Sequence, residues 1–86
     1  MQDKVRVVLY TKPGCGLCDR MKAEMKNAGA ENLYTLEEVN IETDDELFAR
    51  YRYDIPVLLI NGAEAFRHRL KAADFASYVT SLLRAG

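Results

Sequence analysis

Hydrophobic and polar positions along the chain switch between two periods, which is typical of strands alternating with helices. Three apolar runs are rich in β-branched or aromatic residues, and we predict a strand from each of them, at residues 5–10, 33–41 and 57–60. Asn61-Gly62 follows the third run, and this dipeptide is a strong signal for a tight hairpin. We therefore expect residues 63–67 to return antiparallel to the third strand.

The first helix is predicted directly after the turn that ends the first strand. Leu17, Met21 and Met25 recur at four-residue spacing, so they form one apolar face of a helix that begins near Cys15 or Gly16. Cys18 lies about one turn into this helix, and we expect its side chain close to the methionines of that face.

Two more helices follow in the second half of the chain. Thr43 and Glu46 have the spacing of a capping box, which predicts that Thr43 caps the second helix. Pro56 disfavours helical backbone at the residue before it, so that helix should end near Asp54. The last helix should begin near residues 70–72, because apolar residues then fall at i, i+3, i+4, i+7 and i+8: Phe75, Tyr78, Val79, Leu82 and Leu83.

The order of elements is βαβ followed by ββα. Such an order predicts an α/β fold with a four-stranded mixed sheet and helices on both faces. With 86 residues, the chain has the length of one domain, covering residues 1–86.

Composition and charge narrow the range of partners. Apolar residues make up 49% of the chain and the net charge is −1, without a block of like charge, so we expect no nucleic-acid partner. The first apolar run is too short for a membrane span and Arg6 interrupts it, so we expect no membrane partner either. We expect a cytoplasmic monomer, and paired cysteines in that compartment more often carry out chemistry than brace a fold.

Cys15-Gly16-Leu17-Cys18 is the chemically most informative segment. A CxxC motif between a strand and a helix favours a redox site. Cys15 would be the nucleophile and Cys18 the resolving thiol. The thiolate is the attacking species, and a free thiol has a pKa of about 8.5. Lowering the pKa by about two units takes roughly 2.7 kcal/mol of preference for the anion, whereas a helix N-terminus contributes about 0.3–1 kcal/mol, and up to about 2 kcal/mol in good geometry. We therefore expect the amides of the first helical turn and the charge of Lys12 to supply the rest, while Asp19 would oppose the anion if it faced the sulfur.

Four other interpretations of the two cysteines remain open. They are a structural disulfide, a zinc site, an iron–sulfur cluster shared between two chains, and a redox-sensing module without turnover. His68 is the only histidine and no further cysteine is present, so a four-ligand zinc site within one chain is disfavoured. We expect no bound metal and no tightly bound cofactor. His68, Arg67 and Arg69 are expected on a solvated edge of the sheet. The alternatives are a general-base role for His68 and attraction of an anionic substrate by the two arginines.

The chain resembles a glutaredoxin of the thioredoxin superfamily from about Val5 to Leu83. The resemblance is carried by the segment from Tyr10 to Cys18, by Asp54-Ile55-Pro56 and by the order of elements. It implies a thioredoxin-like, three-layer fold. Where glutaredoxins often have Pro-Tyr between the cysteines this chain has Gly16-Leu17, and Phe66-Arg67-His68-Arg69 stands in place of a Gly-Gly pair with its following Asp.

The resemblance also implies a function, thiol–disulfide exchange on a small-molecule or protein disulfide. Cys15 and Cys18 would be the catalytic residues, and Lys12 would stabilise the thiolate. Pro56 would follow a cis peptide bond. Glutathione, as a possible co-substrate, or a thioredoxin reductase would restore the dithiol. The residues implied in contacts with substrate or glutathione are Lys12, Gly16, Leu17, Ile55 and Pro56.

Overall fold

The computed structural model describes residues 4–85 and contains one four-stranded sheet with three α-helices. The order is βαβ followed by ββα, as predicted. Two short 3-10 turns, Glu31–Leu33 and Ile41–Thr43, precede and follow the second strand. The main elements are β1 (Val5–Thr11), α1 (Gly16–Asn27), β2 (Tyr34–Asn40), α2 (Asp45–Tyr51), β3 (Val57–Ile60), β4 (Ala63–Arg67) and α3 (Ala72–Ala85).

The sheet has the strand order β2-β1-β3-β4 and is mixed. β1 pairs in parallel with β2 and antiparallel with β3, and β3 pairs antiparallel with β4. The β-branched and apolar sequence of β1 fits this central place, because a central strand is covered on both faces. The carboxyl ends of β1 and β2 therefore lie at the same end of the sheet, where the segment leading into α1 begins.

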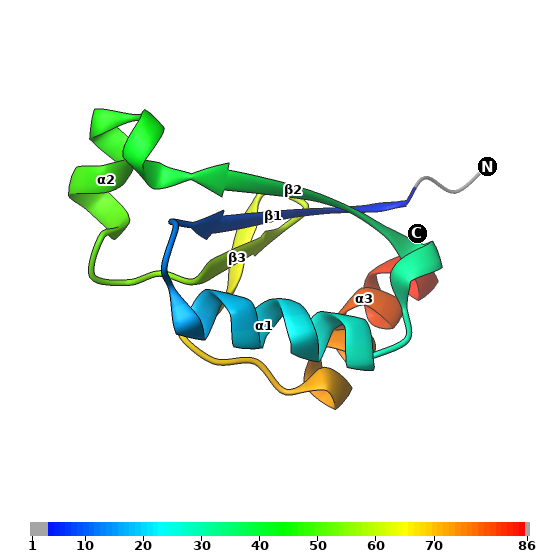
Figure 1. Ribbon diagram of the computed structural model, residues 1–86. Helices are drawn as coiled ribbons and strands as arrows, with labels where there is room; N and C mark the ends of the chain where they lie inside the picture. Colours follow the sequence, from blue (N-terminus) through cyan, green and yellow to red (C-terminus); the bar gives the residue numbers. More distant parts are fainter. Residues whose placement is uncertain (1–3, 86) are drawn as a thin grey trace.

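One face of the sheet carries the main hydrophobic core. Figure 1 shows α1 and α3 on the same side of the sheet, and both helices contact each other. The ring of Tyr34 meets the ring of Phe75 edge-on, with centroids 5.1 Å apart. The apolar face predicted for the last helix is thus confirmed, and that of the first helix is confirmed for Met21 and Met25 but not for Leu17, which is exposed. The fully buried side chains of this core include Val7, Leu9, Met21, Met25, Leu58, Ile60, Phe75 and Val79.

A second, smaller cluster lies on the opposite face and involves α2. It consists of Cys18, Ile41, Tyr51, Ile55 and Val57. Figure 1 shows α2 at the end of the sheet to which β1 and β2 point. Helices therefore lie on both faces, as predicted. Cys18 is buried on the same helix as Met21 and Met25, as expected, and its side chain packs with this second cluster.

The β3–β4 hairpin is tied to β1 by its turn. Asn61 and Gly62 both have positive φ angles, 51° and 84°, as the predicted tight turn requires. The Arg6 amide donates to Asn61 Oδ1 at 2.9 Å, and the Asn61 amide donates to the Arg6 carbonyl at 2.8 Å. These two bonds fix the turn against the central strand.

A register shift between Leu58 and Leu59 alters the direction of the side chains that follow on β4. Leu59 pairs with Glu64, whereas Leu58 pairs with Phe66, so one extra residue of β4 is accommodated. Because strand side chains alternate between faces, this shift puts Phe66 on the face of the main core. Its ring there meets the ring of Tyr78 at 5.6 Å.

The N-terminus of α2 differs from the prediction. Asp44, and not Thr43, is the N-cap, and its Oδ1 accepts hydrogen bonds from the amides of Glu46 and Leu47 at 2.9 and 3.1 Å. The hydroxyl of Thr43 instead donates to the carbonyl of Asn40 at 2.8 Å. A carboxylate at the N-cap also interacts favourably with the helix dipole, which a hydroxyl does less well.

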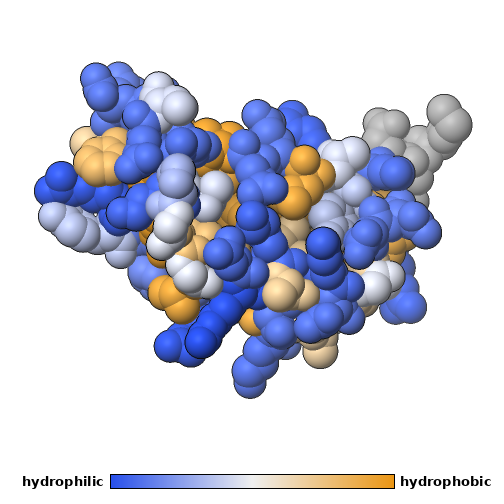
Figure 2. All heavy atoms as spheres, viewed as in Figure 1, coloured by the Kyte–Doolittle hydropathy of each residue, from blue (hydrophilic) through white to orange (hydrophobic). Residues whose placement is uncertain are grey.

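The view in Figure 2 shows a surface dominated by hydrophilic side chains, with hydrophobic side chains exposed in small separate patches. Within residues 4–85, no helix has both the length and the apolar character needed to cross a membrane.

Replacing Asp44 with alanine tests the observed cap. We expect Asp44→Ala to lower the free energy of unfolding by about 1 kcal/mol, because two helix amides lose their acceptor. Thr43→Ala serves as the control and should change it by less than about 0.5 kcal/mol, since it removes only an exposed side-chain bond. Urea unfolding followed by far-UV circular dichroism measures both. A larger loss for Thr43→Ala would contradict the assignment.

Candidate functional site

The segment between β1 and α1 places a cysteine at the start of a helix. Gly14 has a φ of +76°, which lets the chain turn sharply after Pro13. Cys15 is the N-cap of α1, and its Sγ accepts a hydrogen bond from the amide of Cys18 at 3.1 Å. A sulfur in this place faces the unpaired amides of the first helical turn, which favour a negative charge.

Cys15 and Cys18 form a disulfide across this first turn. Their Cα atoms are 5.2 Å apart, within the range that a disulfide needs. Cys15 is half-buried, whereas Cys18 is only 1% exposed. The two cysteines named from the sequence are thus brought together, and Cys15 is the one that a second molecule can reach.

Charges near the disulfide are unevenly compensated. Lys12 is half-buried and forms no ion pair with any residue of the described chain. Asp19, by contrast, is 77% exposed and lies 3.8 Å from Lys22 Nζ. Lys22 also donates to Glu38 at 3.1 Å, and this hydrogen bond raises the pKa of the lysine. The acidic residue next to Cys18 therefore has a cationic partner, while the cation before Cys15 has no acidic one.

The segment around Pro56 lies against the buried cysteine. The Ile55–Pro56 peptide bond is cis, as the resemblance implies, and Ile55 belongs to the same cluster as Cys18. The Ile55 amide donates to the Tyr51 carbonyl at 3.1 Å, and the Pro56 carbonyl accepts from the His68 amide at 2.8 Å. Within residues 4–85 the Ile55 carbonyl accepts no backbone hydrogen bond, so it is the group of this residue left for a ligand.

An ion-pair network neutralises the acidic residue before this bond. Arg67 lies 3.3 Å from an oxygen of Asp54 and donates to Glu64 at 2.6 Å. The hydrogen bond with Glu64 raises the pKa of Arg67 further, so the guanidinium is charged at every physiological pH. The sequence placed Arg67 on a solvated edge and missed its pairing with Asp54. The pairing of Val57 with Arg67 in the sheet would have indicated that Arg67 lies near Asp54. This pairing depends on the bulge in β4, which the sequence pattern does not show.

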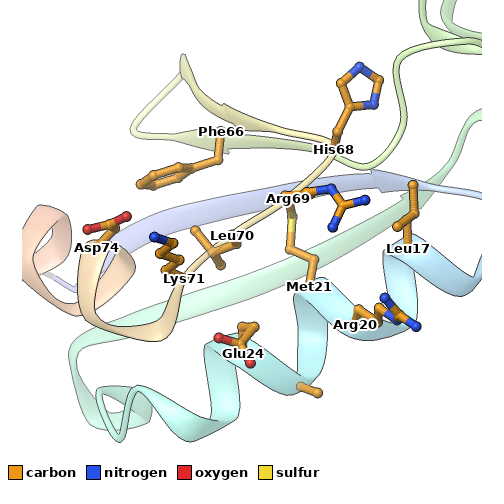
Figure 3. A pocket seen from close by; sticks show the side chains of 11 residues that line it. Leu17, Arg20, Met21, Glu24, Phe66, His68, Arg69, Leu70, Lys71 and Asp74 are labelled. Carbon is orange, nitrogen blue, oxygen red and sulfur yellow. The ribbon is translucent and has the colours of Figure 1, made fainter.

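A groove of about 530 Å³ begins at Leu17, one of the two residues between the cysteines. Leu17, which is 36% exposed, lines one end of it together with Arg20 from α1. Figure 3 shows the Arg69 side chain extending toward that end, while the exposed His68 points its ring away from the groove. The surface position expected for His68 is thus confirmed.

Among the described residues, no group of three or more histidine, cysteine or acidic side chains is arranged to hold a metal ion.

Comparison with known proteins gives a family match over most of the chain. The family model of the Glutaredoxin-like domain (DUF836) matches residues 6–80. A curated relative, the glutaredoxin-like protein YDR286C homolog of Dictyostelium discoideum, is 32% identical over 72 residues. The aligned region covers 77% of this chain and 67% of that protein.

Solved structures share the fold at lower sequence identity. Protein Ne2328 from Nitrosomonas europaea superimposes with a TM-score of 0.74 and 25% identity, covering 91% of this chain and 94% of that one. Protein XcR50 from X. campestris gives 0.74 and 23%, covering 87% and 96%. A chloroplastic thioredoxin z gives 0.73 and 18%, covering 99% and 82%. These neighbours establish a thioredoxin-like fold.

The difference in burial predicts a difference in reactivity. In the reduced protein at neutral pH, we expect iodoacetamide to alkylate Cys15 at least about tenfold faster than Cys18, because reaction needs an accessible thiolate. Mass spectrometry of timed samples measures both rates, and the same reaction in denaturant is the control, where the rates should converge. Equal rates in the folded protein, or faster alkylation of Cys18, would contradict the site geometry.

Proposed function

The chain belongs to the glutaredoxin-like domain family of the thioredoxin superfamily, and we propose on this premise that it is a thiol–disulfide oxidoreductase acting through Cys15 and Cys18. The single observation that supports this most is the place of the two sulfurs. Cys15 is half-exposed at the N-cap of α1, and Cys18 is bonded to it from within the first turn.

The reaction would proceed in two exchange steps starting from the reduced protein. The Cys15 thiolate attacks one sulfur of a substrate disulfide, and the other substrate sulfur leaves as a thiolate and takes up a proton. The thiolate of Cys18 then attacks the sulfur of Cys15 in the mixed disulfide, which releases the second substrate thiol. In total two electrons pass to the substrate, and the protein ends as the Cys15–Cys18 disulfide.

The charge distribution supports an anion at Cys15. A helix N-terminus contributes about 0.3–1 kcal/mol, and up to about 2 kcal/mol in favourable geometry. The charge of Lys12 adds to this, since it has no acidic partner in the described part of the chain. Asp19 and Asp54 would oppose an anion, but each lies within ion-pair distance of a cation. Removing the positive charge of Lys12 therefore weakens the preference for the thiolate.

A second thiol source must restore the dithiol after each cycle. We propose that two molecules of glutathione do so, forming oxidised glutathione, or that a thioredoxin reductase supplies the two electrons. Lys12, Gly16, Leu17, Ile55 and Pro56 are the residues that we propose touch the substrate. Because the amide of Ile55 is already bonded to Tyr51, its carbonyl is the group that would accept a hydrogen bond from the substrate backbone.

Substitution of each cysteine separately tests the proposed roles. We expect Cys15→Ser to lower disulfide reductase activity by at least about 100-fold, because the attacking group is lost. Cys18→Ser should still form a mixed disulfide with the substrate, detectable by mass spectrometry, because only the resolving step is removed. Reduction of 2-hydroxyethyl disulfide would be measured with glutathione and glutathione reductase, and in parallel with a thioredoxin reductase.

The two coupled assays also distinguish the reductants, since we expect the chain to turn over with one of them. The control reactions without the protein should show no turnover. Activity of Cys15→Ser equal to that of the unaltered chain would contradict the proposal, as would the absence of turnover in both assays.

A further inference from the structure

The groove that begins at Leu17 combines an apolar floor with a charged rim. Met21 and Leu70 are buried at its floor, and the half-buried Phe66 forms part of its wall. In Figure 3, the groove runs from the first turn of α1 to the region of Glu24 and Asp74. It is therefore an elongated surface that starts at Leu17, the residue before Cys18, and not a pocket around the sulfur atoms.

The charges of the groove are separated along its length. Arg20 and Arg69 lie at the end near the disulfide, and Lys71 lies further along. None of these three cations forms an ion pair with another residue of the described segment. At the far end, Oε1 of Glu24 accepts a hydrogen bond from the amide of Ala72 at 3.1 Å. The end nearest Cys15 therefore carries uncompensated positive charge.

The length of the groove indicates the size of its occupant. Leu17 and Glu24 are seven residues apart on α1, which corresponds to about 10 Å along the helix axis. An extended chain covers about 3.3–3.6 Å per residue, so about three residues beyond a reacting cysteine would span this distance. A tripeptide centred on its cysteine has only one residue on each side and would leave most of the groove empty.

We propose that this groove binds the polypeptide segment next to the reacting cysteine of a protein disulfide, and that it selects segments with acidic side chains close to that cysteine. The inference rests on the proposed function, because the substrate cysteine must lie at Cys15 for its neighbours to reach the groove. Arg20 and Arg69 are the residues that determine this selectivity, while the apolar floor holds the segment irrespective of its charge.

The test uses short synthetic peptides, each with one cysteine in a mixed disulfide with an aromatic thiol whose release is followed by absorbance. Three peptides carry Glu, Gln or Lys at the positions flanking the cysteine. We expect kcat/KM for the Glu peptide to exceed that for the Lys peptide by about tenfold or more at low ionic strength, and the ratio to fall as salt is added. Arg69→Glu and Arg20→Glu should each lower this ratio at least about fivefold, because like charge then faces the acidic segment.

Arg84→Glu is the matched control, since it makes the same charge change on an exposed residue in the last turn of α3. It should keep the ratio of the unaltered chain. Far-UV circular dichroism checks that all variants are folded. Equal kcat/KM for the Glu and Lys peptides, or the same ratio in Arg69→Glu and Arg84→Glu, would overturn the proposal.

Equilibrium binding separates failure of this proposal from failure of the proposed function. Fluorescent peptides without cysteine, carrying either Glu or Lys, are titrated with the protein and followed by anisotropy. Tighter binding of the Glu peptide, lost in Arg69→Glu and kept in Arg84→Glu, supports the groove even if the chain reduces no disulfide. Equal affinity for both peptides overturns it, even if the chain reduces 2-hydroxyethyl disulfide efficiently.

Discussion

The hydrogen bond between the Cys18 amide and the Cys15 sulfur, at the N-terminus of α1, is the interaction on which the proposed chemistry depends. A sulfur atom takes the place that a serine or aspartate oxygen more often has at an N-cap. The position of this N-cap is fixed because α1 packs against the sheet. Met21 and Met25 bury that helix in the main core, and β1 delivers the chain to the end of the sheet where the helix starts.

Two sets of ion pairs complement this geometry from opposite sides of the site. Lys22 joins Asp19 to Glu38 and so connects α1 with β2. Arg67 joins Asp54 to Glu64 and so connects the segment before Pro56 with β4. These pairs are exposed or half-exposed and contribute little to stability. Their effect is local. They place a positive charge beside Asp19, which follows Cys18, and beside Asp54, which lies in the segment before Pro56.

Much of the fold follows from local patterns in the sequence. β1 and β3 are recognisable as apolar runs of strand-forming residues, α3 is recognisable because its apolar periodicity matches the face that it buries, and Asn61-Gly62 determines its own turn. The cap of α2 was wrongly assigned because Thr43 and Asp44 are adjacent candidates. The choice depends on the 3-10 turn Ile41–Thr43, to which Thr43 belongs, because the hydroxyl of Thr43 donates there to the carbonyl of Asn40.

The parts of the site that the sequence did not reveal depend on contacts between distant segments. The bulge in β4 shifts the strand register by one residue, so Arg67 lies opposite Val57 where a regular two-residue hairpin would pair it with Pro56. The groove is formed by α1 together with residues 66–74, which the Glu24–Ala72 hydrogen bond joins across 48 positions. No periodicity or motif within either segment specifies that contact. The disulfide site could be predicted because both sulfurs belong to one helical turn.

The most direct test of an anion favoured at Cys15 is the ionisation of both thiols in the reduced chain. Labelling the cysteines with ¹³C at Cβ allows NMR to follow each chemical shift as a function of pH in the same sample. We expect the pKa of Cys15 to lie at least about one unit below the ordinary thiol value of about 8.5, and that of Cys18 to lie above the pKa of Cys15. A Cys15 pKa at or above about 8.5 would contradict the proposed role of the helix N-terminus.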